Sequence, residues 1–402
     1  MIEIPTMWLR LKLGAFSARK VLKVFLSICL LLGAIHVMSL GQGTSSNAPE
    51  EVYGGIEISP EAAKAIALRV SQNEEEGGLK LAYSEVIRLA LWRTGGGAFA
   101  PQATTEAAQA VLTLLTRLRQ QYQVPLERIY FIGTSRLGAD HPADLVSAIR
   151  KTTGMTLTFL DPAAEVQLSI AGTIPRIMKA GAVVIDNRNT SVLMDIGNVG
   201  SQGGYELLKY SQSNSSTPGF DFVAMSLPQG AVNYANDIAR AMGDNGDLSA
   251  FIRQVKASGA MSFRQALRRE MESKPGMINR KRVFLTGGIV WAMATLLYPE
   301  DRQALVPITF ESILQFADKA ARSPRELTNP NLTYIRDRKI RQDIEQDMEA
   351  IRNTFTSRQL IAGAELLKAA GEELKWQDKK LWFARLGHFG CILSYIRLQT
   401  GK

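Results

Sequence analysis

From residue 51 onward, short apolar segments alternate with longer amphipathic ones. The short segments are rich in β-branched and aromatic residues, which is typical of strands. We expect strands at 51–59, 65–70, 79–91, 127–135, 156–160, 182–186, 191–197, 220–228 and 282–288. The longer segments repeat apolar residues at helical spacing, and we expect helices at 104–122, 144–154, 163–178, 231–243, 289–297, 310–322, 340–355 and 358–374. Such alternation predicts an α/β layer architecture.

The alternation starts again at Gly181, after the predicted helix that contains Glu165. A chain of 402 residues with 46% hydrophobic side chains is long enough to bury two cores. We therefore expect two α/β domains, at 50–168 and 180–402. The second domain would include a hairpin insertion at 196–220 and a helical C-terminal part.

The first 45 residues have a different pattern. An uncharged apolar run from Val24 to Leu40 is preceded by a basic segment and followed by a polar, Gly/Ser-rich linker. This pattern predicts a signal anchor that crosses the inner membrane and leaves the globular part on the periplasmic side. A cleaved signal peptide is the alternative.

The net charge of +9 would suit an anionic partner, but much of the excess lies before Val24. We therefore do not predict nucleic-acid binding. Cys29 and Cys391 provide no internal disulfide framework, and the three histidines are scattered, so a zinc site is not expected. A homodimer is compatible with the sequence but is not determined by it.

Several segments together resemble the exopolyphosphatase and guanosine pentaphosphate phosphohydrolase (Ppx/GppA) family. They are "RIYFIGTSRLG", "TFLDPAAEVQLSIAG", "AVVIDNRNTSVLM", "VAMSLPQGAVNY", "VFLTGGIVWAMATLL" and "FTSRQLIAGAELLKAA". The chain would be a divergent, membrane-anchored member. The resemblance implies two actin-like (ribonuclease H-like) domains with an interdomain cleft. It also implies hydrolysis of terminal phosphates from polyphosphate or guanosine pentaphosphate, with Mg²⁺ or another divalent cation.

The resemblance also implies roles for individual residues. Glu165 would activate water, and Glu57 and Asp186 would serve as catalytic and metal-binding carboxylates. Asp186 is preferred to Asp195 because one helix and one strand separate the family's glutamate from its second phosphate-turn aspartate. The implied phosphate-binding residues are Arg136, Asn187, Thr190, Ser191, Gly287 and Gly288.

Both predicted phosphate turns depart from the family pattern. Pro60 has no backbone N–H to offer a phosphate, and "NRNTS" replaces a run of glycines after Asp186. Three hypotheses stay open. The chain binds polyphosphate or a phosphorylated nucleotide with hydrolysis weak or lost, it is an active phosphoanhydride hydrolase, or it is an actin-like interaction module without a ligand.

Overall fold

The computed structural model describes residues 51–70, 79–89, 91, 99–137, 143–175, 191–209, 219–243 and 246–401. From Val52 onward the chain forms one compact unit. The predicted apolar run at 24–40 and the predicted site residues Asp186, Asn187 and Thr190 lie outside the described residues. Within the described ranges, no helix is long and apolar enough to cross a membrane.

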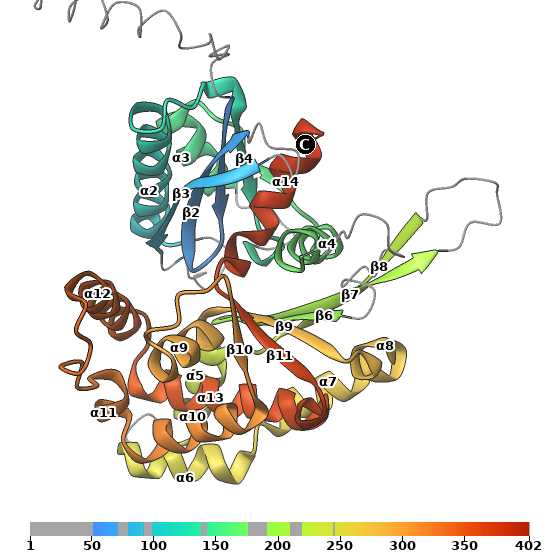
Figure 1. Ribbon diagram of the computed structural model, residues 1–402, viewed down its shortest axis with the longest axis vertical. Coiled ribbons are helices and arrows are strands. Elements are labelled where there is room, and N and C mark those ends of the chain that lie inside the picture. Colours follow the sequence, from blue (N-terminus) through green and yellow to red (C-terminus); the bar gives the residue numbers. More distant parts are fainter. Residues whose placement is uncertain are drawn as a thin grey trace, which may run out of the picture. The chain divides into compact units, whose positions relative to one another are not determined.

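The first sheet has five strands in the order β3-β2-β1-β4-β5. Its strands are β1 (Val52–Ile58), β2 (Ala62–Val70), β3 (Leu79–Arg88), β4 (Ile129–Gly133) and β5 (Thr158–Phe159). The first three strands form an antiparallel meander, whereas β4 runs parallel to β1 and β5 parallel to β4. Figure 1 shows α2 (Pro101–Gln120) and α3 (Ala143–Thr153) on one side of this sheet and α14 (Gly390–Thr400) on the other.

The second sheet has six strands in the order β10-β11-β9-β6-β7-β8. Its strands are β6 (Ser191–Ile196), β7 (Ser201–Lys209), β8 (Gly219–Leu227), β9 (Arg282–Thr286), β10 (Leu305–Ile308) and β11 (Lys380–Ala384). Most helices gather below this sheet in Figure 1. The helices of this part are α5 (Ala231–Ala241), α6 (Leu248–Ser258), α7 (Met261–Ser273), α8 (Gly276–Asn279), α9 (Gly288–Leu297), α10 (Phe310–Arg322), α11 (Pro324–Thr328), α12 (Arg338–Thr354) and α13 (Ser357–Glu373).

The two sheets repeat one topology. In each, the first strand is followed by two antiparallel strands on one side, and a later strand pairs with it in parallel on the other side. The carboxyl ends of β1 and β6 are therefore equivalent positions. Glu57 is the penultimate residue of β1, and Asp195 is the penultimate residue of β6. The predicted α/β class with two sheets is confirmed.

The structure also contains elements that the pattern did not predict. Strands β10 and β11 and helices α6, α7 and α14 were not expected, whereas β7 lies within the hairpin predicted at 196–220. The helix predicted at 163–178 is α4 (Pro162–Thr173). The region after residue 308 was expected to be mostly helical, but β11 is inserted there between β9 and β10. A five-residue strand contains too few apolar–polar alternations to be recognised from the sequence. Strand β11 is recognisable only from its pairing with β9 and β10.

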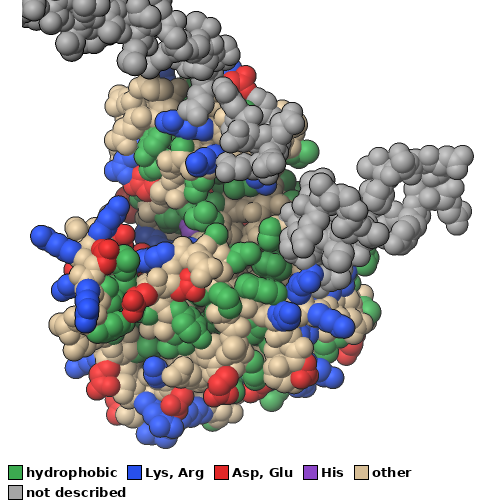
Figure 2. Space-filling view, in the orientation of Figure 1, with side chains coloured by type: hydrophobic (Ala, Val, Ile, Leu, Met, Phe, Trp, Pro, Cys, Tyr) green, Lys and Arg blue, Asp and Glu red, His purple; other side chains and the backbone are tan. Residues whose placement is uncertain are grey.

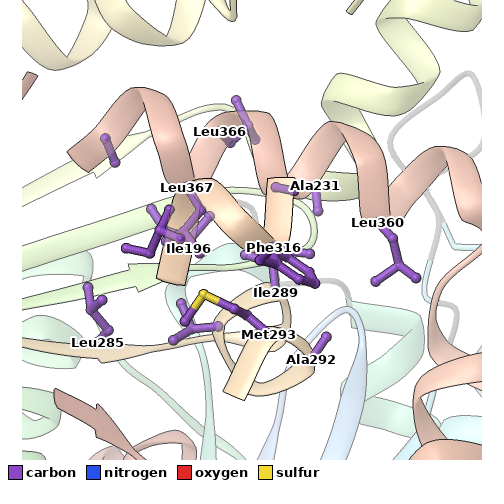
Figure 3. Close-up of a cluster of buried hydrophobic side chains, with 14 of the residues drawn as sticks. Ile196, Ala231, Leu285, Ile289, Ala292, Met293, Phe316, Leu360, Leu366 and Leu367 are labelled. Carbon is purple, nitrogen blue, oxygen red and sulfur yellow. The ribbon is translucent and has the colours of Figure 1, made fainter. Parts of the chain in front are cut away.

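The larger core lies between the second sheet and its helices. Ile196 and Leu285 from neighbouring strands pack with Ile289 and Met293 of α9, and Phe316 of α10 closes the cluster (Figure 3). All five side chains are fully buried. This rigid base holds the ends of β6 and β9, where the candidate site lies.

Candidate functional site

A cavity of about 470 Å³ lies between the carboxyl ends of the strands in the two sheets. Figure 2 shows the surface hollowed between the elements of the first sheet and those of the second. The charged and imidazole side chains that line it, among the described residues, are Glu57, Glu61, Lys64, Arg88, Arg136, Glu165, Asp195 and His388. With four carboxylates and three cations in one cavity, the ion pairs among them determine which groups are left to contact a ligand.

Glu57 is paired with a lysine of the neighbouring strand. Glu57 and Lys64 lie opposite each other in the β1–β2 register, and Lys64 Nζ donates to Glu57 Oε1 at 2.7 Å. Lys64 also donates to the backbone oxygen of His388 at 3.0 Å. The Glu57 side chain is only 3% exposed. A buried carboxylate therefore meets a cation supplied by the chain itself.

Glu165 is held by hydrogen bonds from both sides of the cavity. Asp161 caps α4 by accepting from the backbone N–H groups of Ala163 and Ala164, which places Glu165 in the first turn. Ser135 donates to Glu165 Oε2 through its N–H at 2.7 Å and its hydroxyl at 2.6 Å. Gln202 of β7 donates to Oε1 at 3.1 Å. These donors orient the carboxylate towards the cavity.

Arg136 lies between two acidic residues. It comes from the short turn after β4, and its guanidinium is 3.2 Å from Asp195 Oδ2 and 3.8 Å from Glu61 Oε1. Glu61 belongs to the turn between β1 and β2, and it also accepts from the backbone N–H of Val199 at 3.2 Å. Val199 follows β6 in the second sheet. This cluster of Glu61, Arg136, Asp195 and Val199 thus joins the turns of the two sheets.

Gly287 and Gly288 form the turn from β9 into α9. Gly287 has φ 99°, a conformation that residues with a Cβ rarely adopt. A Cβ there would lie 2.3 Å from Asp195 Oδ1. The turn can pass so close to Asp195 only because Gly287 lacks a side chain. The same turn presents the N-terminus of α9 to the cavity.

Burial changes the acid–base behaviour of the cavity. It raises the pKa of Asp195, and the nearby positive charge of Arg136 opposes this shift. It also raises the pKa of Glu57, with Lys64 opposing. Burial and, to a smaller extent, the positive charge of Lys64 lower the pKa of His388 to about 3. His388 is therefore neutral near pH 7, and the cations of the cavity are Lys64, Arg88 and Arg136.

No protein-family model matches the chain, and the comparison with curated proteins found no match. Solved structures do match. A Ppx/GppA family member from Aquifex aeolicus is 15% identical, with a TM-score of 0.57, and the match covers 88% of this chain and 100% of the other. An exopolyphosphatase-like protein is 14% identical, with a TM-score of 0.58 and coverage of 87% and 99%. This chain has the fold of the Ppx/GppA proteins.

A third match, an exopolyphosphatase from Cytophaga hutchinsonii, is 12% identical, with a TM-score of 0.56 and coverage of 86% and 98%. At these identities the likeness to the Ppx/GppA structures establishes the fold alone. The chemistry of this chain has to be argued from its own cavity.

The Ppx/GppA fold brings most of the described candidate residues together. Glu57, Arg136, Glu165, Gly287 and Gly288 all line the cavity. Ser191 does not, because it is the first residue of β6 and lies at the opposite end of that strand from Asp195.

The cavity residues that sequence reasoning did not select include Glu61, Lys64, Asp195 and Gln202. Asp195 was passed over in favour of Asp186. A signal was present, because an acid at the penultimate position of a strand before "GNVG" matches Glu57 before its own turn. The other three are recognisable only from the pairing of strands and turns across the cavity.

The resemblance implied a divalent cation, and two oxygens of the cavity would suit one. Glu57 Oε2 and Asp195 Oδ1 are buried without a hydrogen-bond partner. Mg²⁺ binds one or two carboxylates and keeps several waters, so these oxygens fit such an ion. However, Lys64 and Arg136 hold the other oxygen of each carboxylate and oppose a second cation. Within the described ranges, no group of three or more His, Cys, Asp or Glu residues could hold a metal ion.

Proposed function

We propose that this chain binds a phosphorylated ligand, either polyphosphate or a phosphorylated nucleotide, in the cavity and hydrolyses it very slowly or not at all. The observation that carries this proposal is the pairing of both strand-end carboxylates with cations of the chain. Glu57 pairs with Lys64 at 2.7 Å, and Asp195 pairs with Arg136 at 3.2 Å. A hydrolase of this fold would need these carboxylates for a metal ion and water.

The turn after β1 supports weak hydrolysis. The N–H of Ser59 donates to the backbone oxygen of Ala62 at 2.8 Å, and Pro60 has no N–H. Two consecutive residues of the turn therefore offer no free backbone N–H to a phosphate. Loss of one preorganised donor typically costs about 3 kcal/mol of transition-state stabilisation, or roughly a hundredfold to a thousandfold in rate.

Ligand binding is supported by the opposite wall. The turn at Gly287 and Gly288 opens α9, and the N-terminus of a helix favours an anion through its free N–H groups and dipole. Arg88 adds a positive charge at the same cavity, with its guanidinium 5.4 Å from the centre of the Trp291 ring. Trp291 offers an aromatic face to a nucleobase, which polyphosphate lacks.

An active hydrolase is the second candidate, and Glu165 favours it. Its carboxylate is buried, oriented by Ser135 and Gln202, and faces the cavity, as a general base requires. This reading requires Lys64 and Arg136 to move away from the two strand-end carboxylates when a metal-bound substrate enters.

The test combines binding and turnover on the full chain. Calorimetry with tripolyphosphate and with guanosine pentaphosphate should show saturable binding. Phosphate release in Mg²⁺ or Mn²⁺ should stay at least about a thousandfold below the usual enzyme rate of roughly 10 s⁻¹. Turnover in the ordinary range that Glu165→Gln abolishes would establish the hydrolase instead. If neither compound binds, the result would favour the third hypothesis, an actin-like interaction module without a ligand.

A further inference from the structure

The turn between β6 and β7 has the construction of an anion site. It runs from Gly197 to Gly200, and the first turn of α5 fixes it. Ala231 N–H donates to the Gly197 oxygen at 3.0 Å, and Val232 N–H donates to the Asn198 oxygen at 2.8 Å. With both carbonyls held by α5, the N–H of Val199 points away from α5 and donates to Glu61 of the first sheet. Turns that direct backbone N–H groups into a concavity bind anions.

An anion of the chain already occupies this turn. Glu61 Oε1 accepts from Val199 N–H at 3.2 Å, and Ser59 Oγ donates to Glu61 Oε2 at 3.3 Å. The Glu61 side chain is 16% exposed. A carboxylate from the first sheet thus accepts from the backbone of the second, as a phosphate oxygen would.

Arg136 completes the arrangement as the counter-ion. Its guanidinium lies against the same turn, since a Cβ on Gly197 would come within 2.6 Å of Arg136 Nη1. It contacts Glu61 on one side and Asp195 on the other. Glu61 and Arg136 therefore already have charged or hydrogen-bonding partners within the chain when no ligand is bound.

We propose that Glu61 is an internal anion that occupies the place of a phosphate at the β6–β7 turn, and that with Arg136 it holds the two sheets together over the cavity. A ligand phosphate can reach the Val199 N–H only by displacing Glu61. The proposal rests on the proposed function only in assuming that phosphate competes for this turn. It makes Glu61 the residue that sets the affinity of the cavity for phosphate.

The experiment measures binding of inorganic phosphate and pyrophosphate to the full chain by calorimetry. Glu61→Gly removes the carboxylate and should raise affinity at least about tenfold, equivalent to about 1.4 kcal/mol. Glu61→Gln keeps the volume and an acceptor oxygen but not the charge, and should raise affinity less. The control is Glu127→Gln, which removes one exposed carboxylate elsewhere and should leave affinity unchanged.

Hydrogen exchange at Val199 gives a second, independent measurement. Its amide should lose protection in Glu61→Gly and regain it when phosphate is added. Unchanged phosphate affinity in both Glu61 variants would overturn the proposal, as would unchanged protection of Val199. If Glu61→Gly does not fold, the Glu61→Gln result decides. Failure of the wild type to bind tripolyphosphate would count against the proposed function but not against this inference, which compares variants with inorganic phosphate.

Discussion

His388 shows how one residue can couple the cavity to stability. It lines the cavity next to Lys64 and has a pKa lowered to about 3, first by burial and then by the neighbouring positive charge of Lys64. Arg88 also contributes to this lowering, while a backbone hydrogen bond involving Arg385 opposes the shift. The folded protein therefore keeps His388 neutral at pH values where the unfolded chain, with an ordinary histidine pKa of about 6.5, binds a proton.

This difference predicts a pH dependence. Between pH 6.5 and about 3 the unfolded state binds more protons at His388, so its contribution to stability is fully present above 6.5 and is lost as the pH falls. The slope from this group is at most about 1.4 kcal/mol per pH unit. Urea unfolding of wild type and His388→Asn between pH 7.5 and 4.5 should show a shallower decline in the variant. Parallel curves would contradict the assignment.

At the scale of the element, the β9–α9 turn depends on a glycine conformation. Gly287 combines φ 99° with close approach to Asp195 and to the backbone oxygen of Ile196. Gly154, which follows α3, also has a positive φ of 73°, but a Cβ there would meet nothing within 4 Å. An alanine at Gly287 would therefore suffer both backbone strain and steric overlap, whereas an alanine at Gly154 would suffer backbone strain alone.

We therefore expect Gly287→Ala to reduce the free energy of unfolding by roughly 2–4 kcal/mol, because strain and overlap add. Gly154→Ala should cost about 1 kcal/mol, from strain alone. Chemical denaturation of both variants tests this. Equal losses would mean that the turn at Gly287 relaxes away from Asp195.

At the scale of the whole described molecule, the chain returns at its end to the first sheet. After β11 in the second sheet, α14 packs against α4 and β1. The contact between the two helices is a backbone contact, since a Cβ on Gly172 would lie 2.0 Å from the oxygen of Gly390. This packing fixes α4, and with it Glu165, relative to the first sheet.

Alanine at Gly172 tests the contribution of this contact. In an exposed helix, Gly→Ala usually stabilises by about 1 kcal/mol. Here the backbone of α14 would have to move, and we expect a net loss of roughly 2 kcal/mol. Gln167→Ala on the exposed side of α4 is the control and should change stability by less than about 0.5 kcal/mol. A stabilised Gly172→Ala variant would show that α14 does not pack tightly on α4.

The sequence by itself determined the features that depend on neighbouring residues. Apolar periodicity predicted the α/β class and most helices, because hydrophobic spacing acts within a few residues. The resemblance of several short segments to the Ppx/GppA family implied roles for Glu57, Glu165, Gly287 and Gly288, all of which line the cavity.

Only the tertiary structure decided which charges meet. Lys64 faces Glu57 through strand register, and Arg136 reaches Asp195 and Glu61 from a turn of the other sheet. The insertion of β11 between β9 and β10 and the return of α14 to β1 likewise join segments far apart in the chain. Such contacts depend on the pairing of distant strands and on side-chain packing, and the hydrophobic pattern of one segment contains no information about its distant partner.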